Sequence, residues 1–198
     1  LSSGTIITKQ EPGGRVNIGT DFYAWIINTS SGKMLTNSND DVRTYSENGD
    51  STQVWKFERY DDGAYQITSV SNGKALDVSK ANSENGTNVQ VWEINHEWAQ
   101  RWFIYGSQGN YSLRPECAPW SRLDIDGAYE GEDGKVQIWE KLVSTAQNFT
   151  IQEIAEPLVS KQDIGDNFYA YITNVEAERN LTNEGFEEEV VIRAEKGD

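Results

Sequence analysis

Between Phe22 and Ile154 the hydrophobic residues fall in short runs, many of which alternate with polar residues. Turn-forming pairs such as Asp62-Gly63 and Asn72-Gly73 separate these runs. Short runs rich in β-branched and aromatic residues, with Gly-containing turns between them, are typical of strands in an all-β sandwich or barrel. No segment carries the long period of a helix. The runs include Tyr23–Asn28, Tyr65–Val70, Val89–Trp92, Trp102–Tyr105, Tyr111–Arg114 and Val136–Trp139.

One triplet, Gln-x-Trp or Gln-x-Phe, recurs at a fixed interval. Gln53-Val54-Trp55, Gln100-Arg101-Trp102 and Gln147-Asn148-Phe149 follow one another at a spacing of 47 residues. Two further copies, Gln90-Val91-Trp92 and Gln137-Ile138-Trp139, lie between them and are also 47 residues apart. A spacing this regular indicates one supersecondary unit used three times.

The three units share a layout but differ in detail. In the second unit, Gly73–Val78 is followed by a loop that carries Asn85-Gly86-Thr87, and then by a Gln-x-Trp triplet. The third unit repeats this order, with Leu123-Asp124-Ile125 before its first triplet. The first unit is the weakest copy, because its loop between Thr36 and Val42 is shortened and it has no first triplet.

A longer-range repetition predicts the domain organisation. Residues 163–172 mirror residues 17–26, and Leu181-Thr182-Asn183 mirrors Leu35-Thr36-Asn37, both at an offset of 146. We therefore expect a leader or linker over 1–16, a threefold domain over 17–154, a linker over 155–162, and the first repeat of a truncated second domain over 163–198.

The last segment poses a problem of burial, because one repeat cannot bury its apolar face alone. It would pack on the first domain, pair with another chain, or be cut from a longer natural protein. We favour the last explanation for its origin, with packing on the first domain in this form.

Composition narrows the classes of partner. The 198 residues carry a net charge of −15, with 32 acidic and 17 basic side chains, which argues against nucleic acid or an anionic membrane as the main partner. No stretch approaches the roughly 20 apolar residues of a membrane span, so we expect no membrane insertion. The single cysteine, Cys117, excludes an internal disulfide. His96 is the only histidine, and nothing in the sequence places it beside Cys117.

The repeat resembles that of the ricin B-chain-like lectins, also called family 13 carbohydrate-binding modules. Ala75-Leu76-Asp77-Val78, Asn85–Trp92 and Gln100-Arg101-Trp102 together are close to the family's repeat signature. The resemblance covers 17–154 fully and 160–198 as one partial repeat. It implies an all-β β-trefoil, which is a six-stranded barrel capped by three hairpins. The family fold places Trp55, Trp102 and Phe149 in the barrel base, and their glutamines would tie the loop backbone of each repeat together.

The resemblance also implies where sugars would bind. A carboxylate would accept hydrogen bonds from two sugar hydroxyls, an aromatic ring would contact the apolar face of the sugar, and amide side chains would hold the carboxylate. Carried over residue by residue, the second repeat offers Asp77, Gln90, Trp92, Asn95 and Gln100, and the third offers Asp124, Gln137, Trp139 and Gln147. The first repeat has Thr36, Arg43 and Tyr45 at these places and is expected to be silent, as is the partial copy with Thr182.

Each of these side chains has a plainer alternative role. Asp77 and Asp124 could cap their own turns through backbone N–H groups, and Trp92 and Trp139 could be buried under the hairpins. Trp98 and Trp120 lie in turns beside the two sites, either as extra stacking surfaces or, the role we favour, as hydrophobic cover.

Two departures from the family pattern bear on these sites. Ala99 and Ala146 stand where the family often has an Asn, which predicts weak sites. Ala75 with Ile94, and Arg122 with Lys141, replace the family's cysteine pair, and the second replacement predicts a more open, cationic site in the third repeat.

Three classes of function remain to be compared. The leading hypothesis is a lectin module for galactose or a related sugar, secreted as part of a larger bacterial protein such as a toxin or a glycoside hydrolase. The rival is a β-trefoil that binds no sugar and serves as an interaction scaffold or inhibitor-like domain. An enzyme is disfavoured, because no pair of carboxylates is singled out by a motif and one histidine gives no triad or zinc site. Asp124–Gly127 only faintly resembles a calcium loop, so the sequence predicts no metal and no cofactor.

Overall fold

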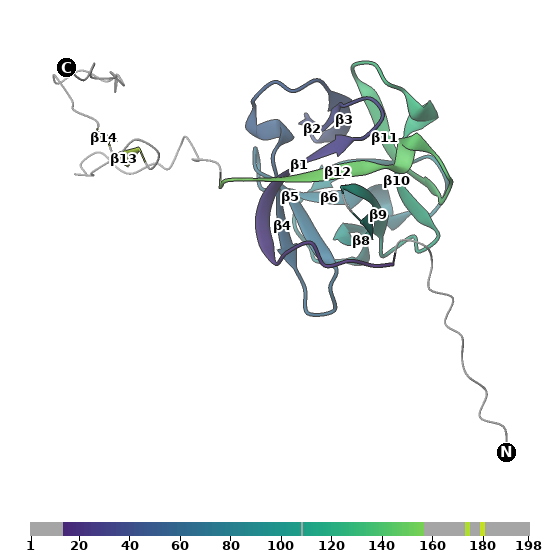
Figure 1. The fold of residues 1–198 in the computed structure, drawn as a ribbon. Helices are drawn as coiled ribbons and strands as arrows, with labels where there is room; N and C mark the ends of the chain where they lie inside the picture. Colours follow the sequence, from purple (N-terminus) through teal and green to yellow (C-terminus); the bar gives the residue numbers. More distant parts are fainter. Residues whose placement is uncertain (1–13, 108, 157–172, 175–178, 181–198) are drawn as a thin grey trace. The chain divides into compact units, whose positions relative to one another are not determined.

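The computed structural model describes residues 14–107, 109–156, 173–174 and 179–180. Two compact units divide the chain at Pro157. In the first unit the described residues form twelve strands of one sheet and five short 3-10 helices. Figure 1 shows how the strands are arranged in this unit. Its strands are β1 (Asp21–Asn28), β2 (Met34–Ser38), β3 (Asp41–Tyr45), β4 (Trp55–Arg59), β5 (Tyr65–Ser69), β6 (Ala75–Val78), β7 (Thr87–Trp92), β8 (Arg101–Ser107), β9 (Asn110–Pro115), β10 (Ser121–Ile125), β11 (Gly134–Glu140) and β12 (Phe149–Ile154). The 3-10 helices are η1 (Ser51–Gln53), η2 (Ser79–Ala81), η3 (Trp98–Gln100), η4 (Asp126–Ala128) and η5 (Thr145–Gln147).

Six of the twelve strands close a ring. The first and fourth strands of each repeat pair with each other, as β1–β4, β5–β8 and β9–β12. The fourth strand of each repeat also pairs with the first of the next, as β4–β5, β8–β9 and β12–β1. The last of these pairings joins the two ends of the domain, and Figure 1 shows β1 and β12 side by side. A sheet closed in this way has no free edge.

The other six strands form three hairpins, β2–β3, β6–β7 and β10–β11. Each hairpin contacts the other two through β3, β7 and β11, so that they meet in a triangle. A closed six-stranded ring with three hairpins is a β-trefoil, and the all-β fold class expected from the sequence is confirmed.

Alternation along the strands explains how the barrel fills. In β1 the side chains of Phe22, Ala24 and Ile26 are buried, and the residues between them are only partly buried. The aromatic residues predicted for the barrel base, Trp55 and Trp102, are fully buried, and so is Phe149. Each tryptophan donates its indole N–H to a backbone carbonyl, that of Leu35 at 3.0 Å and of Leu76 at 2.9 Å.

The domain starts slightly earlier than the sequence analysis placed it. Arg15 forms a bridge with Tyr105, and the backbone N–H of Val16 donates to Ile104 at 2.9 Å. Arg15 also stacks on Phe103, with its guanidinium 4.0 Å from the ring centre. These two residues therefore belong to the barrel and not to the leader, because a cation–π contact and edge pairing hold them there. The rest of the predicted leader, residues 1–13, lies outside the described residues.

In the second unit the structure describes two short strands, β13 (Thr173–Asn174) and β14 (Arg179–Asn180). They pair antiparallel, with Thr173 opposite Asn180. Subtracting the offset of 146 gives Ile27 opposite Met34, which is the pairing of β1 with β2. The rest of the predicted partial repeat, Thr182 included, lies outside the described residues.

Candidate functional site

A buried carboxylate lies at the base of the second hairpin. Asp77, on β6, is only 4% exposed. Its Oδ1 accepts from the side-chain amide of Gln90 at 3.1 Å, and its Oδ2 accepts from that of Gln100 at 3.2 Å. Asp77 does not cap its own turn, which was the plainer role considered for it, because both donors are glutamine side chains and not backbone N–H groups.

The third hairpin repeats this arrangement. Asp124, on β10, is 5% exposed. Its Oδ1 and Oδ2 each accept at 3.1 Å, from Gln137 and Gln147 respectively. Gln137 also donates to Asp126 at 3.3 Å, a contact that the second repeat lacks because Ser79 stands there. The second and third repeats therefore contain equivalent polar clusters, and the cluster in the third repeat has a second acid.

Local structure explains why these groups meet. Asp77 and Gln90 are directly opposite in the β6–β7 hairpin, as are Asp124 and Gln137 in β10–β11, and directly opposite residues on one face are within contact distance. The second glutamine comes from the 3-10 helix before the next barrel strand.

That second glutamine joins several parts of its repeat. Gln100 accepts from the backbone N–H of Asn95 at 2.9 Å and donates to the carbonyl of Glu93 at 2.9 Å. Gln147 does the same with Leu142 and Glu140. The prediction that these glutamines tie the loop backbone together is confirmed.

Each carboxylate accepts hydrogen bonds from uncharged glutamine amides. Burial raises the pKa of Asp77 and of Asp124, and the glutamine hydrogen bonds offset only part of that shift. Within the described part of the chain no ion pair involves either acid. A carboxylate oxygen can accept two hydrogen bonds, so each retains capacity for a hydroxyl donor.

Each of the two hairpins carries a tryptophan two residues beyond the glutamine that faces the aspartate. Trp92, at the end of β7, is 55% exposed, so the alternative of a buried residue is wrong for it. Trp139 is half-buried and lines a pocket of about 370 Å³ together with Asp124, Gln137 and Leu142. The flanking Trp98 and Trp120 are 66% and 82% exposed. Our expectation that they serve as hydrophobic cover is therefore wrong, because most of the surface of each side chain is exposed to solvent.

Asn95 is the predicted site residue that the structure uses differently. Its Oδ1 accepts from the backbone N–H of Glu97 at 2.9 Å, which caps the turn before η3. No hydrogen bond joins its side chain to Asp77 among the described residues. Leu142 takes the equivalent place in the third repeat, so the two sites have different rims.

In each of the three repeats, two successive residues have left-handed backbone conformation, starting three residues after Thr36, Asp77 or Asp124. Lys80 and Ala81 have φ of 58° and 52°, and Gly127 and Ala128 have φ of 62° and 52°. Left-handed backbone is unfavourable for residues with a side chain, so the recurrence shows that the fold requires this turn. Sequence analysis missed it, since the pair is Asn39-Asp40 in the first repeat and only Gly127 is a glycine.

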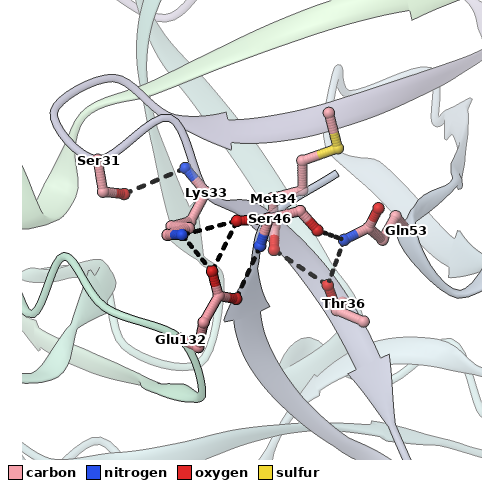
Figure 2. A network of polar contacts seen from close by, with 7 residues as sticks. All are labelled: Ser31, Lys33, Met34, Thr36, Ser46, Gln53 and Glu132. Atoms are coloured by element: carbon pink, nitrogen blue, oxygen red, sulfur yellow. Dashed lines mark hydrogen bonds and ion pairs between the residues drawn. The ribbon is translucent and has the colours of Figure 1, made fainter. Parts of the chain in front are cut away.

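The first repeat keeps the glutamine but not the acid. Gln53 donates to Thr36 Oγ1 at 3.1 Å and to the carbonyl of Ser46 at 2.8 Å, as Figure 2 shows. Thr36 in turn donates to the carbonyl of Met34. Arg43 donates a hydrogen bond from its Nε to Asp41 Oδ2 at 2.7 Å. The first repeat therefore places no carboxylate where the other two have one.

The loop of the third repeat is held by the first repeat. Glu132 accepts from Lys33 Nζ, from Ser46 Oγ at 2.6 Å and from the Ser46 backbone N–H at 2.9 Å (Figure 2). These hydrogen bonds, the one from Lys33 first, lower the pKa of Glu132 to about 2. Tyr45 adds a hydrogen bond to Asp133 at 2.6 Å. No motif marks Glu132, and sequence analysis missed it.

Other reactive groups are separate from these clusters. His96 contacts Tyr60 and Gln66, and not Cys117. Burial raises the pKa of the Cys117 thiol to about 11, so the thiol is protonated at neutral pH. Across the described ranges, no three His, Cys, Asp or Glu side chains gather as a metal site, and no helix is long and apolar enough to cross a membrane.

Solved structures share this fold. A designed threefold-symmetric protein, ThreeFoil, is 25% identical with a TM-score of 0.64, and the match covers 67% of this chain and 99% of that one. The Macrolepiota procera ricin B-like lectin, solved with lactose, is 19% identical with a TM-score of 0.61, covering 69% and 99%. A mosquitocidal holotoxin is 20% identical with a TM-score of 0.65, and the match covers 71% of this chain but 18% of the toxin.

The family follows from the sequence match as well as from the fold. No match was found among the curated proteins. The model of the ricin-type β-trefoil lectin domain-like family matches residues 15–92 and 53–139, which together span well over half of the chain. With three Gln-x-Trp or Gln-x-Phe repeats in a closed trefoil, the chain belongs to the ricin-type β-trefoil lectin domain-like family.

Proposed function

We propose that the chain is a carbohydrate-binding module with two sugar sites, one at Asp77 and one at Asp124. The observation that carries this proposal is the pairing, in both repeats, of a buried carboxylate held by two glutamine amides with a tryptophan beside it. Burying an acid without a nearby cation is costly for folding. Sugar hydroxyls are donors that can hydrogen-bond to such a carboxylate.

The chemistry favours a galactose-type sugar. Two hydroxyls on one side of the ring donate to the carboxylate, and the C–H face of the sugar lies on Trp92 or Trp139. Lactose is bound by the Macrolepiota procera relative, which makes it the first sugar to test. Each site is expected to bind weakly, because Ala99 and Ala146 supply no hydrogen bond and each missing one costs on the order of 1 kcal/mol.

The test is titration of the full chain with lactose, by calorimetry and by ligand-observed NMR. We expect two sites in the natural chain, one site in Asp77→Ala or Asp124→Ala, and none in the double variant. Asp61→Ala is a matched control, because Asp61 is exposed and makes no hydrogen bond or ion pair to a described residue. Circular dichroism establishes that each variant folds. Unchanged lactose binding by the double variant would overturn the site assignment.

The wider role is also a proposal. We infer a bacterial, secreted parent protein, a toxin or a glycoside hydrolase, which this module would deliver to glycans. The likeness to part of a mosquitocidal holotoxin supports the toxin alternative. The pairing of Thr173 with Asn180 supports a partial second trefoil, and repeated modules raise avidity when single sites are weak. We expect no turnover of a chromogenic glycoside, and failure to bind any glycan on an array would favour the scaffold function.

A further inference from the structure

Two arginine side chains converge on the turn between β4 and β5. The three hairpins follow β1, β5 and β9, so this turn lies at the other end of the barrel. Arg59 is the last residue of β4, and Arg15 lies on the segment that runs beside β8. A Cβ placed on Gly63, within the turn, would lie 2.7 Å from Arg15 Nη2 and 3.0 Å from Arg59 Nη2. The two guanidiniums are therefore close neighbours, although they carry the same charge.

The acid of this turn is shared with a third arginine. Asp62 forms an ion pair with Arg101 at 2.5 Å, whereas Arg15 donates to the uncharged backbone carbonyl of Asp62. A hydrogen bond from the backbone N–H of Ala64, and then the charges of Arg101 and Arg15, lower the pKa of Asp62. One carboxylate therefore balances Arg101 first and Arg15 only in part.

Arg59 has no acid partner among the described residues. None of their ion pairs includes it, and no hydrogen bond joins its side chain to another of them. Its Nε is buried without an acceptor. Such a donor is uncommon in native proteins, and an ion that the group can bind is one physical explanation. Asp61, the other acid next to the turn, is exposed and is not paired with it.

Arg15 is held in place by an aromatic ring. Its guanidinium lies 4.0 Å from the centre of the Phe103 ring, and that of Arg114 lies 4.5 Å from the same centre. Stacking fixes the plane of a guanidinium, so that less freedom is lost when it binds an anion. Arg15 is itself exposed, which lets an anion reach it from solvent.

Two guanidiniums that face one point suit a tetrahedral oxyanion. Each presents a planar fork of N–H donors that matches two oxygens of a phosphate or sulfate group. An anion between them also offsets the repulsion of the two like charges. A carboxylate has two oxygens and one charge, and it can fill one fork but not both.

We propose that Arg15 and Arg59 form a binding site for a phosphate or sulfate group, at the end of the barrel remote from the hairpins. The site includes neither Asp77 nor Asp124, so it is independent of the proposed sugar sites. It gives the chain a second ligand class, a small tetrahedral oxyanion that is free or carried as an ester.

The experiment is urea denaturation of the full chain at constant ionic strength. Part of the chloride is replaced by phosphate, sulfate, glycerol phosphate or acetate. We expect saturable stabilisation by the tetrahedral anions and little by acetate. An anion present at about ten times its Kd should raise the folding equilibrium constant about tenfold. Comparison of glycerol phosphate with inorganic phosphate distinguishes an ester from the free anion, and no saturable effect of any tetrahedral anion would overturn the inference.

Two variants locate the effect. Arg59→Gln and the exposed Arg15→Gln are each expected to abolish the saturable response. Arg43→Gln is the matched control, because Arg43 pairs with Asp41 in the first hairpin, and it should keep the response. This control also accounts for the general stabilisation of folded proteins by phosphate and sulfate. A response that survives in both Arg59→Gln and Arg15→Gln would overturn the site. Lactose binding should be unchanged in all three variants, so a failure here leaves the proposed function intact.

Discussion

At the scale of residues, single side chains distinguish the two proposed sugar sites from the first repeat. The second and third repeats place an aspartate where the first places Thr36, and the same glutamine donates to whichever side chain is there. Because that glutamine also joins the loop to the barrel strand, it is needed for the fold in all three repeats. The acid is present only in the two repeats for which we propose a sugar site.

The raised pKa of the two aspartates predicts the pH dependence of binding. The ionised carboxylate accepts the sugar hydroxyls, and burial moves protonation of Asp77 and Asp124 to a higher pH than in an exposed aspartate. As the pH is lowered, lactose affinity should therefore begin to fall at a higher pH than the range near about 3.9 in which exposed aspartates titrate. Protonation of these two groups favours the folded state, because their pKa is higher there than in the unfolded chain. Titrations at several pH values, with tryptophan fluorescence to monitor folding, measure both effects. An affinity that falls only in the pH range where exposed aspartates titrate would contradict this account.

The equivalent core positions predict the cost of changing Trp102. Trp102→Phe removes the hydrogen bond to Leu76, which should cost about 1 kcal/mol of unfolding free energy. Phe149 already fills the equivalent place, so the ring itself fits. Trp102→Ala leaves a cavity and should cost about 3–5 kcal/mol. Urea denaturation measures both values, and equal losses would show that packing does not distinguish the two variants.

At the scale of elements, each site depends on a neighbouring repeat. The loop after Asp124 contacts the first repeat through Glu132, and the loop after Asp77 contacts the third, where Asn85 accepts from the backbone N–H of Glu140 at 2.7 Å. The first repeat therefore supports the proposed third-repeat site, although it has no aspartate at the equivalent position itself.

Removing this support should weaken only the third site. Glu132→Gln removes the ion pair with Lys33, and the loop that carries Asp126 to Ala128 becomes less ordered. In the Asp77→Ala background we expect lactose affinity to fall several-fold, while in the Asp124→Ala background it stays unchanged. Glu84→Gln is the matched control, because the Glu84 carboxylate makes no hydrogen bond or ion pair to a described residue. An equal loss at both sites would point to a general effect on folding.

Glu132 also has an effect on stability with a definite sign. Its pKa is lowered to about 2, from an ordinary value of 4.5. Its contribution to stability is therefore present above about pH 4.5 and is lost as the pH falls through about 2. Thermal melts of the natural chain and of Glu132→Gln should differ most near neutral pH and converge in strong acid. A difference that persists undiminished at pH values below the lowered pKa would argue against this ion pair as the cause.

At the scale of the whole molecule, the barrel closes through its two ends. Six residue pairs join β1 to β12, and Phe149 contributes a fully buried ring. A chain that ends at Asn148 should therefore fail to fold, because it leaves one edge of β1 unpaired, although β4 still pairs with β1, and it leaves the core open. A chain that ends at Glu156 retains β12 and should unfold cooperatively. Circular dichroism and denaturant titration separate the two outcomes, and a cooperative transition in the shorter chain would contradict the closure argument.

The sequence by itself determined the threefold fold, because burial of Trp55, Trp102 and Phe149 at equal spacing allows few other arrangements. It also singled out Asp77 and Asp124 as candidate site residues, since both stand at a fixed place in a repeat. Only the tertiary structure decided what lies around them. Glu132 meets Lys33 although 99 residues separate them, and Arg122 joins Tyr105 and Lys141 around one hollow. Periodicity reports which side chains face the core, whereas contacts between repeats depend on loop conformations such as the left-handed pair at Lys80 and Ala81, which no local pattern encodes.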